Sequence, residues 1–148
     1  MEFQKTIYLS SAESEKNSSS NTTCDYKIQL SETLYLPGEK WFCALSEIWI
    51  PSELNRYSPL YVCSDICEAS YVSHTRLPVL RQLTNATVER KHASSKQALH
   101  LFPHLYYVPM RQRAVNSIHI YITDSNGHTL SVKSGMCVCA LQIKQIQL

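Results

Sequence analysis

The sequence predicts an all-β protein, an antiparallel β-sandwich for which a single jelly roll is the natural arrangement. About ten short runs show the apolar and polar alternation of strands, and no window shows the apolar spacing of an amphipathic helix. All three glycines, Gly38, Gly127 and Gly135, stand at predicted turns. So many short strands in a chain of this length favour a two-sheet sandwich, with a small closed barrel as the alternative.

The composition permits one folded domain over residues 1–148. This length is near the usual size of a single domain, and 44% hydrophobic with 18% charged residues is a globular composition. The formal net charge is only +2. Contact with nucleic acid therefore stays open but lacks electrostatic support.

The first residues, MEFQKTIYLSSAESEKN, lack the basic start and long apolar stretch of a secretory signal, and no apolar run could span a bilayer. We therefore expect a reducing compartment, no secretion by a signal peptide and no membrane partner. In that compartment the six cysteines should be buried free thiols. Cys63-x-x-x-Cys67 and Cys137-x-Cys139 lack the two-residue gap of zinc knuckles, so we expect neither a metal nor a cofactor.

The N-terminal part contains two expected strands. Residues 3–9 should form a short strand at a sheet edge, and the Ser-rich residues 10–21 should form a surface loop. Alternation returns over residues 24–30, and Pro37-Gly38 marks a tight turn after it. The chain must reverse at that turn.

Residues 41–51, WFCALSEIWIP, form the most apolar segment. A strict two-residue repeat places Trp41 and Trp49 on one face and Ile48 on the other, so both faces are apolar. This pattern predicts a central strand covered by protein on both sides. Because a lone carboxylate is costly to bury, Glu47 should lie at a strand end or beside a basic partner, in a structural rather than a catalytic role.

The middle of the chain alternates between strands and loops. Residues 60–67 and 71–83 read as two further short strands, interrupted by residues 68–70 and by Pro78, and 98–102 and 105–108 are two apolar runs. Between them, residues 84–96 are polar and mildly basic. Their basic side chains could touch phosphates, but the low charge density favours a solvated loop.

The clearest strand pattern covers residues 117–143. Alternate isoleucines over 117–123, a turn at 124–127, an alternating run over 129–133 and a third run over 136–143 follow one another. The third run is apolar on both faces, which is typical of a strand covered on both sides. Together these runs predict a three-stranded antiparallel meander.

Signatures of catalysis are lacking in the sequence. It contains no G-x-S-x-G context, no Gly-rich phosphate loop, no H-E-x-x-H and no paired acids, and its six histidines are scattered. We therefore expect a protein that is not an enzyme.

Three blocks in order along the chain resemble the minor capsid, or penton, proteins of Polinton (Maverick) elements and the related adintoviruses. The first resembles the family's opening strand, Asn-Thr loop and W-x-x-A-L-x-E-I-x-x-P strand, at Ile7 to Ser11, Asn21-Thr22, Gly38 and Trp41 to Pro51. The second is similar to its Y-V-x-x-D-I-x-E and P-L-L-R runs, at Tyr61 to Val72, Thr75 and Pro78 to Arg81. The third is similar to its closing strands, at Tyr107 to Pro109, Ile118, Ile120, Ile122, Asp124, Gly127 and Gly135.

The resemblance implies a structural protein of the virion, assembled in the cytoplasm or nucleus. It implies a single jelly roll that forms a homopentamer at the fivefold vertices of an icosahedral shell and contacts a double jelly-roll major capsid protein. Members of the family carry a longer middle section, whereas here residues 51–59 join the first two blocks almost directly. If strands are missing with that section, the roll is compact or incomplete and depends on neighbouring subunits.

A ring of identical subunits needs a head-to-tail interface, and aromatic side chains and arginine are enriched at interface centres. The residues that we expect there are Tyr57, Tyr61, Tyr106, Tyr107, Met110, Arg111 and Arg113. For each one taken singly, a core tyrosine or a solvated arginine is an equal alternative. The competing function is a soluble β-sandwich module that binds a ligand or a host protein.

Overall fold

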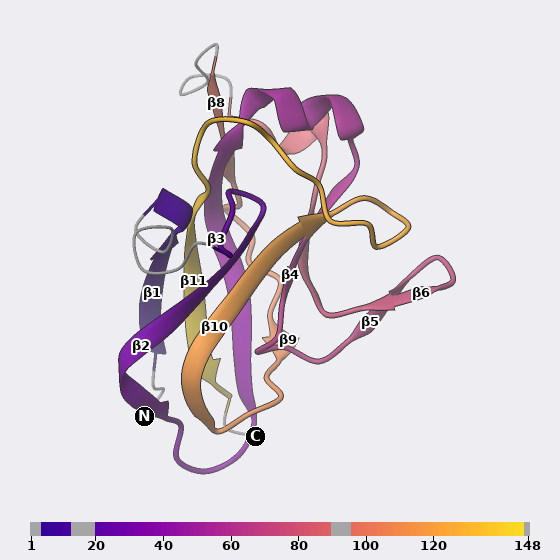
Figure 1. The fold of residues 1–148 in the computed structure, drawn as a ribbon. Coiled ribbons are helices and arrows are strands. Elements are labelled where there is room, and N and C mark those ends of the chain that lie inside the picture. Colours follow the sequence, from indigo (N-terminus) through magenta and orange to yellow (C-terminus); the bar gives the residue numbers. More distant parts are fainter. Residues whose placement is uncertain (1–3, 13–19, 90–95, 147–148) are drawn as a thin grey trace.

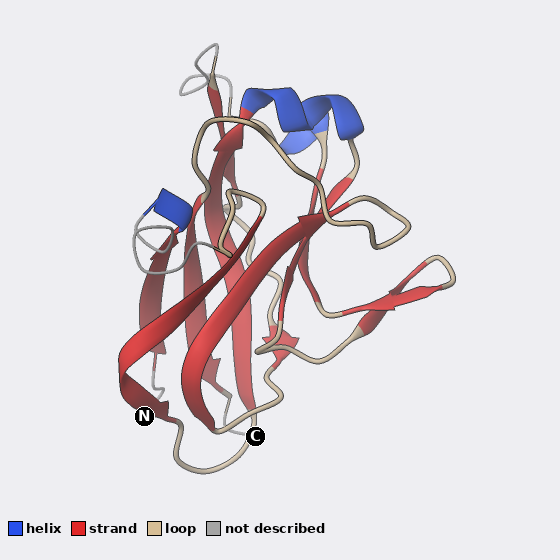
Figure 2. Cartoon of the chain, viewed as in Figure 1, coloured by secondary structure: helices blue, strands red, loops and turns tan. Residues whose placement is uncertain are grey.

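The computed structural model describes residues 4–12, 20–89 and 96–146 of the 148-residue chain. Two antiparallel β-sheets pack face to face (Figures 1 and 2). The first sheet contains β1 (Gln4–Ser10), β11 (Val138–Gln145), β3 (Trp41–Pro51), β8 (Gln97–Leu101) and β9 (Val108–Pro109). The second contains β2 (Asp25–Tyr35), β10 (Ala114–Thr123), β4 (Leu60–Ser64) and β7 (Val79–Leu83). A separate hairpin is formed by β5 (Ser70–Val72) and β6 (Thr75–Leu77).

The strand order is that of an eight-stranded jelly roll. The first sheet runs β1-β11-β3-β8 and the second runs β2-β10-β4-β7. Strands β1, β2, β3 and β4 thus pair with β11, β10, β8 and β7, all antiparallel. Such pairing is that of one long hairpin rolled up into two sheets. The predicted single jelly roll is confirmed.

The roll is complete within one chain, although residues 51–59 are too few for the longer middle section of the penton proteins that the sequence resembles. In this segment the 3-10 turn η1 (Ser52–Tyr57) carries the chain from the end of β3 in one sheet to β4 in the other. β1 lies at a sheet edge, as expected, and β3 lies between β11 and β8. The short connection therefore removes no strand of the roll.

The core lies between the inner faces of the two sheets. On β10, Ile118, Ile120 and Ile122 are fully buried, and Leu141 and Ile143 of β11 are buried in the same cluster. Branched side chains suit the pleated surface of a strand, where they pack against the facing sheet. The alternation read from the sequence therefore identifies the inward positions of both strands.

A β-bulge divides β3 and corrects the predicted faces. Ser46 is an extra residue in the pairing of β3 with β11, so the alternation changes phase after it. The strict repeat put Trp49 on the same face as Trp41, but Trp49 is half-buried on the outer face, and Ile48 is fully buried in the core. Glu47 is likewise half-buried on the outer face in the middle of β3. The expectation that it lies at a strand end or beside a basic partner was wrong, since Glu47 has no ion pair with another described residue.

The predicted meander over residues 117–143 is also wrong. Its first run is β10 in one sheet and its third run is β11 in the other, so the two strands do not pair. In residues 129–133, the described chain shows one bridge, between Thr123 and Thr129, and no strand. Leu130 and Val132 are partly buried against the core without belonging to a strand. Alternation reports the buried side of a segment, but it does not identify the partner strand.

The predicted interruption of residues 71–83 at Pro78 is confirmed, because β6 ends at Leu77 and β7 begins at Val79. The part before Pro78 forms the hairpin of β5 and β6, which the sequence did not predict. Val72 and Leu77 of the hairpin pack against Cys63 and Tyr121, on the outer face of the second sheet. The hairpin projects from the sandwich in Figure 1. Its apolar side therefore covers part of one outer face.

The remaining connections differ from the prediction in detail. The loop predicted at residues 84–96 begins with η2 (Asn85–Thr87) and a bridge between Val88 and His100. Its basic residues 90–95 lie outside the described residues. The apolar run 105–108 contributes strand structure at residue 108 alone, as the start of β9.

All six cysteines are free and buried, which confirms the expected thiols. Burial raises the pKa of Cys24 to about 11 and the pKa values of Cys63 and Cys139 to about 12. These side chains are therefore neutral at physiological pH and pack as small apolar groups. In the described ranges, no three His, Cys, Asp or Glu side chains cluster as metal ligands, and no helix is long and apolar enough to cross a membrane.

Candidate subunit interface

The seven side chains predicted for an interface are spread over the molecule. Tyr57 ends η1 at one end of the sandwich, whereas Arg113 precedes β10 at the other end (Figure 1). Tyr61 lies on β4, and Tyr106 and Arg111 flank β9. The structure therefore does not bring the set together as one patch.

Tyr61, Tyr107 and Met110 contact other side chains of their own chain. The hydroxyl of Tyr61 accepts a hydrogen bond from Gln82 Nε2 at 3.1 Å, and its ring packs beside the hairpin. Lys144 Nζ lies 5.7 Å from the ring centroid of Tyr107, and Met110 packs partly buried against the core. These contacts account for the position of each side chain in the single chain, and an interface role stays a prediction.

Tyr106 is held by an arginine that sequence reasoning did not single out. The Arg81 guanidinium carbon lies 3.6 Å from the Tyr106 ring centroid and 4.2 Å from that of Phe102. Arg81 Nη1 also donates to the His104 carbonyl at 2.9 Å. This cation–π stack fastens residues 102–106 to β7 and leaves the outer side of Tyr106 exposed.

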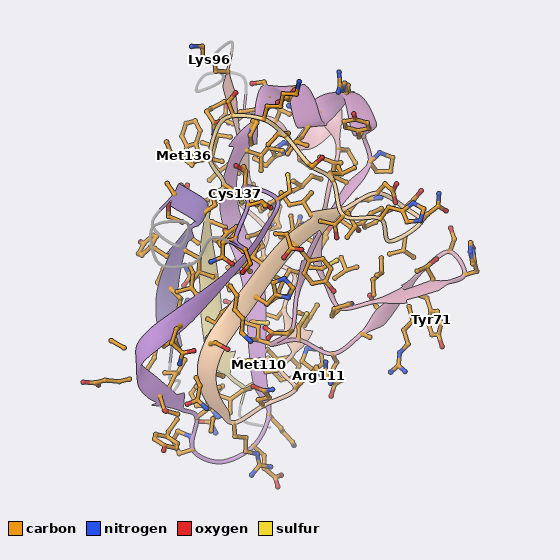
Figure 3. All side chains as sticks on the ribbon, viewed as in Figure 1. Tyr71, Lys96, Met110, Arg111, Met136 and Cys137 are labelled. Atoms are coloured by element: carbon orange, nitrogen blue, oxygen red, sulfur yellow. The ribbon has the colours of Figure 1, made fainter. Side chains whose placement is uncertain are left out.

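Residues 108–111 join the first sheet to the root of the hairpin. Met110 N donates to Trp41 O at 3.0 Å on one side, and Arg111 N donates to Ile66 O at 2.9 Å on the other. Both residues lie at the lower part of the sandwich in Figure 3, whereas Tyr71 points outward from the hairpin. Met110 and Arg111 are therefore fixed through their backbones.

The Arg111 side chain lines an open cleft of about 650 Å³ beside the hairpin, with Glu68, Ala69 and Arg76. Arg113 lies 3.5 Å from Glu39 in an exposed ion pair, which contributes little to stability. Both predicted arginines are thus on the surface, at separate places. Two cations and one carboxylate in an open cleft do not by themselves specify a reaction.

The outer face of the first sheet did not enter the predicted interface. Two neighbouring rows of it are mostly apolar and are called the apolar outer face below, while the rest of the same face carries Gln4, Thr6, Gln142 and Lys144. Strand pairing aligns these two rows across the sheet. One row consists of Tyr8, Ala140, Glu47 and Leu101, and the next consists of Ser10, Val138, Trp49 and Leu99. Tyr8 is 73% exposed and Leu101 is 44% exposed, while Trp49 and Val138 are half-buried. The signal for this face was the apolar character of both sides of residues 41–51.

The outer face of the second sheet is different. On β2 and β10 it carries polar pairs, with Lys27 opposite His119 and Gln29 opposite Ser117. His119 Nε2 lies 2.5 Å from Asp25 Oδ1 in an ion-pair geometry. The apolar part of this face, near β4, is the part that the hairpin covers. The two outer faces therefore differ, since the first sheet carries the two mostly apolar rows and the middle of β2 and β10 carries polar pairs.

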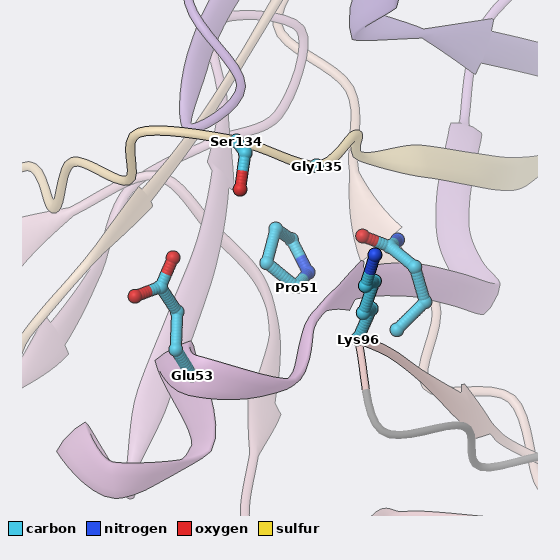
Figure 4. Close-up of a pocket in the computed structure, with 6 residues that line it drawn as sticks. Pro51, Glu53, Lys96, Ser134 and Gly135 are labelled. Carbon is cyan, nitrogen blue, oxygen red and sulfur yellow. The ribbon is translucent and has the colours of Figure 1, made fainter.

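A second cleft lies at the upper end of the sandwich, near η1. Its volume is about 510 Å³, and its lining includes Pro51, Glu53, Lys96, Ser134 and Gly135 (Figure 4). Figure 4 shows the Glu53 and Lys96 side chains on opposite sides of Pro51. The described lining contains neither a histidine nor a thiol that could activate the Ser134 hydroxyl. The arrangement gives no support for nucleophilic catalysis.

One buried polar residue holds this end together. His100 on β8 is fully buried, with Nδ1 2.6 Å from Thr87 Oγ1 and Nε2 3.2 Å from Asn55 Oδ1. These partners belong to η2 and η1, so the imidazole links both turns to the first sheet. These contacts give His100 a structural role at this end of the sandwich.

Comparison with models of known protein families and with curated proteins gave no match to this chain. The resemblance to penton proteins therefore stands on the three residue blocks described above.

Proposed function

We propose that the chain is a structural shell protein, the penton subunit of an icosahedral capsid. In this proposal it forms a homopentamer at each fivefold vertex and contacts a double jelly-roll major capsid protein. It acts in the virion after assembly in the cytoplasm or nucleus, and it catalyses no reaction.

The observation that carries the proposal is the apolar outer face of the β1-β11-β3-β8 sheet. Tyr8 and Leu101 are exposed there, next to the half-buried Trp49 and Val138. Antiparallel sheets that face water normally present polar side chains on that side, and a contiguous apolar surface marks an interaction site. Burial against a neighbouring subunit removes this surface from water.

The fold and the residue blocks support the choice of a penton among assembling proteins. Eight-stranded jelly rolls are common in viral capsids, and this chain contains a whole one. A sandwich has several different faces, so two of them can form a heterologous contact that repeats around a ring. Fivefold closure requires that each contact rotate the next subunit by the matching angle.

The mass and shape of the purified full-length chain test the proposal. We expect light scattering to give about five times the 16.9 kDa mass of one chain, because a closed ring has no free contact to add a further copy. Negative-stain images should show rings with fivefold symmetry.

A chain that remains monomeric at high concentration would contradict the penton proposal. If that monomer bound glycans or peptides, the binding-module alternative would replace it. A ring with another number of subunits would also exclude the fivefold vertex.

A further inference from the structure

A carboxylate lies at the centre of the apolar outer face. Glu47 is half-buried on β3, between Ala140 on β11 and Leu101 on β8. No ion pair or side-chain hydrogen bond joins Glu47 to another residue within 4–12, 20–89 or 96–146. Covering this face would take the carboxylate out of water, which is costly unless a cation comes with the cover. We therefore expect the surface that covers this face to carry a positive charge.

The outer face of β2 and β10 offers such a charge. Lys27 is exposed near the start of β2, and the neighbouring pair on this face, Gln29 and Ser117, is uncharged. The nearby carboxylate of Asp25 is already engaged by His119. Lys27 has no ion pair with another described residue, so its ammonium group is available to pair with a carboxylate of another subunit.

We propose that successive copies of the chain stack face to back. The apolar outer face of the β1-β11-β3-β8 sheet in one copy contacts the outer face of β2 and β10 in the next copy, and Glu47 pairs with Lys27 across the contact. This inference rests on the proposed function and names the two surfaces that the ring would use.

The placement of the two faces makes the contact heterologous. They lie on opposite sides of the sandwich, so each copy offers one of each, and the contact closes into a ring when it also rotates each copy by the angle that fivefold closure requires. Sheets that pack face to face lie about 10 Å apart, a gap that opposed lysine and glutamate side chains can bridge. Tyr8 and Leu101 border the row that contains Glu47, and exclusion of water by them would strengthen the ion pair.

Exchange of the two charges in the full-length chain tests the contact. Glu47→Lys and Lys27→Glu each place like charges opposite each other, and each is expected to shift the ring to the mass of a single chain. The double variant restores opposite charges and is expected to recover the ring. Recovery is the decisive result, because two independent losses of stability would add rather than cancel.

Two further variants act as a matched pair. Tyr8 and Tyr71 are 73% and 72% exposed, but Tyr8 lies on the apolar face and Tyr71 lies on the hairpin. Tyr8→Ser is expected to raise the protein concentration at which half of the rings dissociate by roughly tenfold or more, because it removes an aromatic side chain from an interface. Tyr71→Ser should leave it unchanged. Glu53→Lys, exposed on η1, controls for the change in net charge.

The outcomes separate this contact from the penton proposal. A wild-type pentamer that persists in Glu47→Lys and Tyr8→Ser would overturn the contact and leave the penton proposal standing. Disruption by both single charge variants without recovery in the double variant would overturn the pairing with Lys27. A wild-type monomer would overturn both proposals. Circular dichroism on each variant checks that the β fold is retained.

Discussion

His100 makes the stability of the fold depend on pH. Burial lowers the pKa of this imidazole from 6.5 to about 4, because the charged ring would lose its hydration inside the protein. The two ring nitrogens already have partners inside the protein, since Nδ1 lies 2.6 Å from Thr87 Oγ1 and Nε2 lies 3.2 Å from Asn55 Oδ1. A second proton on the ring would bury a charge with no carboxylate of the described residues beside it to balance it.

We expect the free energy of unfolding to decrease as the pH falls from about 6.5 towards 4. In this window the unfolded chain binds a proton at His100 and the folded chain does not, so protonation favours unfolding. The stabilisation is complete above about pH 6.5, and the loss approaches roughly 3 kcal/mol near pH 4. Urea unfolding over this pH range measures it.

His100→Gln is the matched variant, because glutamine is neutral throughout this pH range. The difference in stability between the wild type and His100→Gln should shrink as the pH falls. His74→Gln is the control, because His74 is exposed between β5 and β6 and has no ion pair with another described residue. This variant should keep the decrease in stability that the wild type shows. Equal pH slopes for the wild type and His100→Gln would show that the buried imidazole does not titrate as described.

The role of His100 could not be read from its sequence neighbourhood. Its partners Asn55 and Thr87 lie 45 and 13 residues away and enter through two separate turns. The cysteines were predictable, because small apolar side chains in strands are buried whatever their partners are. The burial of a residue can be predicted from the local sequence pattern, whereas the hydrogen-bond partners of a buried polar side chain depend on the tertiary structure.

At the scale of elements, Ser46 sets the phase of β3. The residues before it and after it both place apolar side chains in the core, which a strict two-residue repeat cannot do over the whole strand. Ser46 Oγ donates to Ala140 O at 3.1 Å, and Ser46 O accepts from Phe102 N at 3.1 Å. The bulge is thus bonded to both neighbouring segments.

Deletion of Ser46 is expected to destabilise the protein by more than about 3 kcal/mol, since the removal of one residue turns either Cys43 and Leu45 or Ile48 and Ile50 out of the core. Chemical denaturation measures the change. Deletion of Ser131, exposed in the connection between β10 and β11, is the control and should cost far less. Similar losses for the two deletions would show that the bulge does not set the register.

The elements also show which features of the fold a sequence pattern cannot predict. Alternation located β2, β3, β10 and β11 to within a few residues. It could not show that β10 and β11 lie in different sheets, because a strand pattern contains no information about the partner. The hairpin β5-β6 was hidden for a related reason, since three-residue strands are too short to establish a period.

At the scale of the whole molecule, the most informative disagreement concerns residues 41–51. Apolar side chains on both faces predicted a strand covered on both sides, and the second sheet covers one side. The outer side carries Trp49 and Glu47 with Tyr8 and Leu101 at the ends of its row. The predicted interface residues were chosen for their type and are spread over the molecule, because residue type does not locate a face. A second copy of the chain would supply the cover that the sequence pattern implies.

Self-association through this face has a thermodynamic consequence that does not require imaging. If a ring buries the apolar face, then association and folding are coupled, and the apparent Tm of the wild type should rise with protein concentration. Glu47→Lys should abolish that dependence, because a monomer unfolds at a temperature independent of its concentration. Differential scanning calorimetry over a hundredfold range of concentration, with Glu53→Lys as the control that keeps the dependence, measures both. A wild-type Tm that is constant over this range would mean that the outer face of the β1-β11-β3-β8 sheet stays in water, and the apolar row across Tyr8 and Leu101 would then need a different partner.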